Sequence, residues 1–257
     1  MNQILAQLTE LTGLGQDWLW TATLVFLRVG AAIFLMPAFG EQVVPQRVRL
    51  VLALAFTAVV APAVAPGITT QGYAYPAAVE VLIGLALGIG MRLFILALQV
   101  TGAIIAQTTS LAQLFGGATP EPQPAIGNLL TMASLALAVL SGLHIHAASL
   151  LILSYSVLPA GHLPGGADMA NWGLIQIARA FALGFSLAAP FVIASVLYNI
   201  ALGIISRAMP QLTVSLVGAP ALTAGGLVLM AIVVPLILAF WLGSFNGFLA
   251  APFRTGP

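Results

Sequence analysis

The chain has 257 residues, of which 61% are hydrophobic and 5% are charged, and its mean hydropathy is +1.11. Soluble domains carry roughly 25% charged residues, so this composition predicts an integral membrane protein. The net charge is +1 and lysine is absent, which excludes a basic surface for nucleic acid. Cysteine is also absent, which excludes disulfides and thiolate metal or redox sites.

Apolar runs of about 20 residues predict membrane-spanning helices. In chain order, six spans are expected near 18–36, 48–66, 77–105, 126–158, 174–205 and 212–250. The last run contains Gly225, Gly226 and Pro235, so a bent helix, a long tilted helix and a tight hairpin all remain open. Sixteen prolines and 26 glycines predict kinked helices buried in an assembly. The expected fold is all-α and polytopic, with about six long kinked helices.

The few arginines predict the orientation of these spans. Arg47, Arg49 and Arg207 lie at the first and fifth loops, and the positive-inside rule places such loops in the cytoplasm. The last two spans then form a helical hairpin with a cytoplasmic turn at 206–211. The candidate residues of this turn region are Asn199, Gly203, Arg207, Pro210 and Gln211.

Three charged residues, Arg28, Glu80 and Arg92, are candidate intramembrane charges, and Arg179 lies in the fifth span. Ionisable residues inside spans are functional hypotheses by default. Glu80 and Arg92 are separated by about 18 Å along one helix, so they cannot pair with each other. We expect each charge to pair across a helix interface or to reach a headgroup region, with an ion relay as the weaker alternative.

Two motifs suggest chemistry that their context disfavours. His144 and His146 are two residues apart, so on a helix their rings point about 200° apart and cannot grip one metal ion. Ser186 stands in a Gly-x-Ser-x pattern similar to rhomboid intramembrane proteases, where the activating histidine follows the serine; here every histidine precedes it. We therefore expect no catalysis, no metal and no cofactor.

Small and polar residues mark two further features. Gly84 and Gly88 form a small-xxx-small face that lets helices approach closely. The polar segment 107–115 is followed by two glycines and a Pro-x-Pro-x-Pro run, which cannot continue a helix. Such a segment either lines a cavity or pore or is an ordinary exposed loop.

Several stretches together resemble the FliR family of flagellar biosynthetic proteins and its injectisome counterpart, the SctT family. They are Phe-Leu-Arg-Val-Gly at 26–30, the segment 37–50, Leu-Ser-Tyr-Ser-Val-Leu-Pro-Ala-Gly at 153–161, and above all 199–211. The likeness runs from about residue 20 to residue 235. It implies a channel subunit of a type III protein export gate in the bacterial inner membrane, at the flagellar basal body.

The resemblance also implies partners and a division of the chain. Members of this family assemble with FliP and FliQ, near FlhB and FlhA, in contact with membrane lipid, and they pass unfolded rod, hook and filament subunits. The implied division is a FliP-like part at 1–165 followed by a FliQ-like hairpin at 166–257.

In the same family a plug-type loop closes the pore, and the matching positions here are near 110–124. The residues carried over are Gln107, Ser110, Leu111, Gln113, Leu114, Phe115, Gly116 and Gly117. A stand-alone secondary transporter, with broken helices around a midplane site, is the alternative from a different class.

Overall fold

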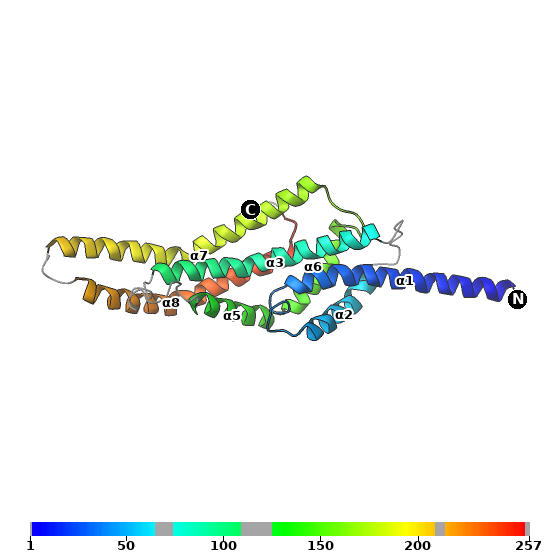
Figure 1. The fold of residues 1–257 in the computed structure, drawn as a ribbon, viewed down its shortest axis with the longest axis horizontal. Coiled ribbons are helices and arrows are strands. Elements are labelled where there is room, and N and C mark those ends of the chain that lie inside the picture. The colour runs from blue at the N-terminus through cyan, green and yellow to red at the C-terminus, as the bar shows by residue number, and fades with distance from the viewer. Residues whose placement is uncertain (1, 65–73, 109–124, 209–213, 255–257) are drawn as a thin grey trace. The chain divides into compact units, whose positions relative to one another are not determined.

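The structure is a computed structural model that describes residues 2–64, 74–108, 125–208 and 214–254, with side chains described for 18–64, 74–108, 126–208 and 222–254 (Figure 1). Within these ranges the regular structure is helical and contains no strand. The helices are α1 (Asn2–Leu35), α2 (Gln46–Ala63), α3 (Ala74–Thr108), α5 (Ala125–Leu140), α6 (Leu143–Val157), α7 (Gly166–Ala208) and α8 (Val214–Ala250). The predicted all-α fold is confirmed.

The described helices also agree with the predicted number of spans. Five stretches are long and apolar enough to cross a membrane: Trp18–Leu35, Gln46–Ala63, Ala74–Thr108, Gly166–Ala208 and Leu222–Ala250. The bent pair Ile126–Leu140 and Leu143–Val157 makes a sixth if it is one broken span. About six spans were expected, and five or six are present.

The predicted fourth span, 126–158, consists of two helices with a break between them. α5 ends at Leu140 and α6 begins at Leu143, with Gly142 between them at a φ of 85°. This left-handed backbone is open to glycine at little cost but is incompatible with a continuing right-handed helix. The N–H of Gly142 donates to the carbonyl of Val139 at 3.1 Å, which closes the turn. Hydropathy is high on both sides, so the apolar pattern does not reveal the break.

The last span is one continuous helix, α8, in which Gly225, Gly226 and Pro235 all lie. The hairpin alternative for this run is therefore excluded. At the other end of the chain, α1 begins at Asn2, well before the first predicted span, because its polar first turns have no hydropathy signal.

The chain divides into two compact units. The first unit comprises the described residues of Met1–Arg92, Val139–Ile175 and Asn246–Pro257, and the second those of Leu93–Ala138 and Gln176–Phe245. Helices α3, α7 and α8 contribute to both. The expected division near residue 165, which rests on likeness to FliP and FliQ, stays a prediction.

The core of the first unit is built on helical stripes of apolar residues. On α3 the buried side chains Val79, Ile83, Leu87 and Met91 recur every four residues, the spacing that lines one face of a helix. In this unit α1 packs against α2, and α2 packs against α6 (Figure 1). Helices α1 and α6 also carry groups that contact the buried charges described below.

The second unit is centred on aromatic contacts to α3. The indole of Trp241 on α8 donates to the carbonyl of Phe94 at 2.8 Å and stacks on Phe245 at 5.1 Å between ring centroids. Gly102 allows a very close approach of α5, because a Cβ there would lie 2.3 Å from the Cα of Gly127. Outside this core, only 22% of the most apolar stretch of α7 and 17% of that of α8 is buried. Most of their apolar surface is thus left for lipid or for other membrane proteins.

Candidate functional site

Arg28 and Glu80, two of the candidate intramembrane charges, form an ion pair in the interior of the first unit. Both side chains are fully buried. Arg28 Nε donates to Glu80 Oε2 at 2.6 Å, and Arg28 Nη2 donates to Glu80 Oε1 at 3.0 Å. Two such parallel bonds are the strongest arrangement of a guanidinium and a carboxylate. The expected pairing across a helix interface is therefore found here, between α1 and α3.

The remaining donors of Arg28 are directed at α6 and the segment that follows it. Arg28 Nη1 donates to Ser154 Oγ at 3.0 Å, and Nη2 also donates to the carbonyl of Leu158 at 3.0 Å. The guanidinium carbon lies 3.6 Å from the ring centroid of Tyr155, within the range of a cation–π interaction. Arg28 thus binds α1, α3 and α6 together.

Glu80 accepts from the same region. The hydroxyl of Tyr155 donates to Oε2 at 3.1 Å, and the backbone N–H of Gly161 donates to Oε1 at 3.0 Å. With the two bonds from Arg28, Glu80 accepts four hydrogen bonds, about the full capacity of a carboxylate. The set of residues in contact is called the Arg28 cluster: Arg28, Glu80, Ser154, Tyr155, Leu158 and Gly161.

The Arg28 cluster is chemically closed. Ser154 Oγ donates its own proton to the carbonyl of Leu151 at 2.6 Å, and both oxygens of Glu80 are occupied. Removing one partner of a buried ion pair costs about 3–5 kcal/mol, because the remaining charge is left uncompensated. The cluster therefore connects three helices, and both carboxylate oxygens of Glu80 accept hydrogen bonds from protein groups.

Gly84 and Gly88 bring α1 and α3 close enough for this pair to form. A Cβ at Gly84 would lie 2.2 Å from the carbonyl oxygen of Arg28, and one at Gly88 would lie 2.9 Å from that of Ala32. The contacts advance in the same direction along both helices, so α1 and α3 run parallel. The close approach predicted from the small-xxx-small face is confirmed.

Arg92, the third candidate charge, helps to fix the loop between α1 and α2. It pairs with the carboxylate of Glu41, and these side chains are 31% and 22% exposed. Arg49 on α2 donates to the backbone carbonyls of Val44 at 3.1 Å and Glu41 at 2.9 Å. Gly40 lets the loop fold back tightly, since a Cβ there would lie 2.4 Å from a backbone oxygen of α1. Arg92 thus belongs to a partly exposed loop contact and not to the closed interior.

The candidate plug residues fall mostly beyond what the structure describes. Gln107 is exposed in the last turn of α3. The other seven, Ser110, Leu111, Gln113, Leu114, Phe115, Gly116 and Gly117, lie outside the described residues.

The candidate turn residues are described in part. Asn199, Gly203 and Arg207 are exposed near the end of α7 at intervals of four, which places them on one face of the helix. The side-chain amide of Asn199 donates to the carbonyl of Ser195 at 2.9 Å. Pro210 and Gln211 lie outside the described residues.

The motifs that suggested metal or protease chemistry are all on exposed positions. His144 and His146 are exposed on α6, and Ser186 is exposed on α7. Among the described residues no group of three or more His, Cys, Asp or Glu is placed to hold a metal ion.

The sequence did not identify five partners of these charges: Ser154, Tyr155, Leu158 and Gly161 for Arg28 and Glu80, and Glu41 for Arg92. Ser154, Tyr155 and Gly161 had a usable signal, because polar groups within or beside an apolar run need hydrogen-bond partners. Glu41 had none, since its contact with Arg92 arises only when the loop folds back onto α3.

Comparisons with known proteins extend over nearly the whole chain. The model of the family described as "Bacterial export proteins, family 1" matches residues 19–248. The chain belongs to this family. Its five or six apolar helices agree with a multi-pass membrane protein.

Several curated flagellar proteins are similar to this chain along most of their length. The "Flagellar biosynthetic protein FliR" of Caulobacter vibrioides is 34% identical, over 86% of this chain and 91% of the relative. The protein of the same name from Escherichia coli K12 is 31% identical over 88% and 89%, and that from Bacillus subtilis is 29% identical over 77% and 79%. These descriptions name export and flagellar biosynthesis, and none names a catalytic activity.

Proposed function

We propose that this chain is a channel subunit of the flagellar type III protein export gate, which passes unfolded rod, hook and filament subunits across the bacterial inner membrane at the basal body. The observation that carries the proposal is the similarity to flagellar biosynthetic proteins over nearly the full length of both chains. The same resemblance also allows an alternative, in which the chain is a subunit of the injectisome export gate. The flagellar names of the relatives favour the flagellum.

The proposed partners are FliP and FliQ in a hetero-oligomeric gate, with FlhB and FlhA nearby. Support comes from the apolar surface that α7 and α8 leave unburied. Small residues lie on these helices at Gly203, Gly225 and Gly243, where an added Cβ would meet no other atom within 4 Å. Such positions let another helix approach closely. In this proposal residues 1–165 are FliP-like, and 166–257 form the FliQ-like hairpin.

Two segments have proposed roles within the gate. Residues 110–124 form the loop that plugs the pore, and the turn at 206–211, with Arg207 beside it, contacts the export machinery on the cytoplasmic side. The exposure of Arg207 at the end of α7 supports such a contact. The Arg28 cluster holds α1, α3 and α6 in a fixed arrangement, which keeps the interior of the subunit closed.

A genetic experiment tests this function. Deleting the gene in its native bacterium should abolish swimming and the appearance of hook and filament subunits in the medium, and a plasmid copy should restore both. A deletion strain that still assembles filaments and swims would contradict the proposal.

A stand-alone secondary transporter is the second candidate, because the break between α5 and α6 resembles the broken helices that line transporter sites. The purified chain alone, reconstituted in liposomes, should then accumulate a small solute against its gradient. A gate subunit should show no such uptake.

A further inference from the structure

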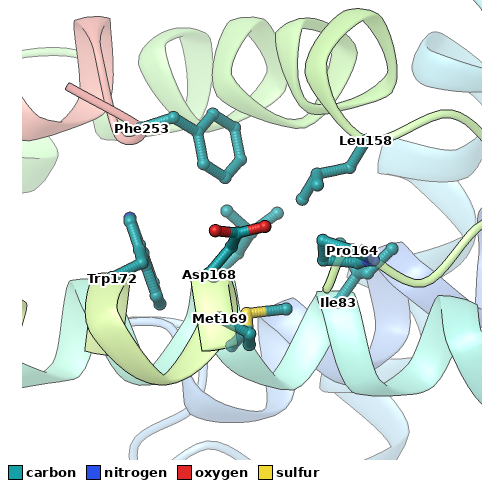
Figure 2. A pocket seen from close by; sticks show the side chains of 9 residues that line it. Ile83, Leu158, Pro164, Asp168, Met169, Trp172 and Phe253 are labelled. Carbon is teal, nitrogen blue, oxygen red and sulfur yellow. The ribbon is translucent and has the colours of Figure 1, made fainter. Parts of the chain in front are cut away.

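A cavity of about 170 Å³ lies in the first unit, between α3, the segment after α6, the start of α7 and the segment after α8. Its walls are mainly apolar, and Asp168 is the one charged residue among those that line it. Figure 2 shows the Asp168 carboxylate in the space between Leu158, Trp172 and Phe253. The lining residues are Ile83, Ala86, Leu87, Leu158, Pro164, Asp168, Met169, Trp172 and Phe253.

Two aromatic rings form one wall of the cavity, and contacts within the chain hold one of them in place. The ring centroids of Trp172 and Phe253 are 6.4 Å apart, at 40° to each other. The indole N–H of Trp172 donates to the carbonyl of Pro252 at 2.8 Å. The far edge of the indole lies against Gly90, where a Cβ would be only 3.2 Å away. The hydrogen bond and the close contact together fix the orientation of Trp172.

Asp168 is exposed, and the ion pairs in the described part of the chain join Arg28 to Glu80 and Arg92 to Glu41, so its carboxylate is open to a cation from outside the chain. It lies in the first turn of α7, where the helix dipole favours a negative charge. A lone carboxylate beside apolar walls cannot supply the six to eight oxygen ligands that calcium requires. An organic cation, with one charge and an apolar body, matches both the carboxylate and the apolar walls.

We propose that this cavity binds an organic ammonium ion. The ammonium lies against Asp168 and the faces of Trp172 and Phe253, which attract cations through their quadrupoles, and the apolar part lies against Ile83 and Met169. The volume is slightly larger than the roughly 150 Å³ of a cavity that holds benzene, so an arylalkyl ammonium such as benzylammonium fits.

Two sources can supply this group: the ethanolamine headgroup of a phospholipid and a free amine. The cavity lies beside the first turns of α7 and the residues that follow α8, and aromatic residues at the ends of spans are typical of the membrane interface. Headgroups are found at the same depth.

The test begins with benzylammonium and its neutral counterpart benzyl alcohol, titrated by ligand-observed NMR against the full-length chain in mild detergent. Asp168→Asn should weaken benzylammonium binding about fivefold to tenfold, through the lost charge contact, and should change benzyl alcohol binding less than twofold. Asp168→Glu should retain most of the affinity. Glu41→Gln, which removes the same charge away from the cavity, is the control and should bind like the wild type.

Phe253→Leu is a second test variant in case Asp168→Asn does not fold. It removes one aromatic face, so it should weaken the binding of benzylammonium more than that of benzyl alcohol. The inference is overturned if the wild type does not bind benzylammonium, or if the folded variants bind it as well as the wild type does.

The lipid arm uses the full chain in nanodiscs of phosphatidylethanolamine or phosphatidylglycerol, followed by native mass spectrometry. Retention of phosphatidylethanolamine by the wild type and its loss in Asp168→Asn identify the headgroup as the source. Benzylammonium binding without selective lipid retention identifies a free amine.

Discussion

Replacing Glu80 alone should destabilise the protein more than replacing Glu80 and Arg28 together. Glu80→Leu leaves the guanidinium of Arg28 fully buried without its carboxylate, which costs about 3–5 kcal/mol. Arg28→Met leaves the carboxylate in the same position and costs a similar amount. If the two sites were independent, the double variant would lose about 6–10 kcal/mol.

The double variant removes both charges, so its loss in free energy of unfolding comes from the polar groups that no longer have a hydrogen-bond partner. The buried N–H of Gly161 and the hydroxyl of Tyr155 each lose their acceptor, at about 1–3 kcal/mol each. The carbonyl of Leu158 loses a donor in a partly buried position, where water is able to replace part of the contact. The total of about 2–6 kcal/mol has a midpoint of about 4 kcal/mol, against about 8 kcal/mol for the sum of the single changes, so the coupling energy should be about 2 kcal/mol or more.

The free energy of unfolding is measured for the purified chain in mild detergent micelles as the fraction of sodium dodecyl sulfate is raised, with helicity followed by circular dichroism. Glu41→Leu is the matched control. It breaks a pair whose side chains are 31% and 22% exposed, and exposed pairs contribute about 0–1 kcal/mol. Additive losses in the double variant, or single variants no less stable than the control, would refute the role assigned to the Arg28 cluster.

Four further outcomes are expected. Gly84→Ala should lower the free energy of unfolding by about 1–3 kcal/mol, because its Cβ would lie 2.2 Å from a backbone oxygen of α1. Gly30→Ala is the control and should not lower it, since its Cβ would meet nothing within 4 Å. Equal losses in the two variants would argue against the close packing of α1 and α3. Gly142→Ala should cost about 1–2 kcal/mol in the same assay, since it places a side chain at a φ of 85°; an unchanged value would show that the break does not need glycine. Arg207→Glu should reduce swimming and subunit secretion while the protein remains in the membrane, and wild-type motility would count against the cytoplasmic contact. Deleting 110–124 should let ions or small solutes leak through assembled gates, and unchanged permeability would remove the plug assignment.

The spans were predictable because hydropathy reports directly how a segment partitions into a bilayer. The break at Gly142 was not, since the apolar run continues on both sides and composition does not report a backbone angle. The alternatives for the last run stayed open for a related reason: Gly225, Gly226 and Pro235 permit a bend, but packing decides whether a helix continues through them.

The buried charges show a similar limit. The sequence predicted that Arg28 and Glu80 would find partners, because an unpaired charge inside a membrane protein is costly. It did not predict that they would find each other, across 52 residues, since that depends on the parallel packing of α1 and α3. The cavity beside Asp168 was equally hidden, because its walls come from four separate parts of the chain.

The central claim is that the chain works as one subunit of an export gate. The most direct measurement is affinity purification of the tagged chain from native membranes in mild detergent, with the co-eluting proteins identified by mass spectrometry. We expect FliP and FliQ to co-elute in a constant ratio to the tagged chain. A chain that elutes without them, and that transports a solute by itself in liposomes, would contradict the account.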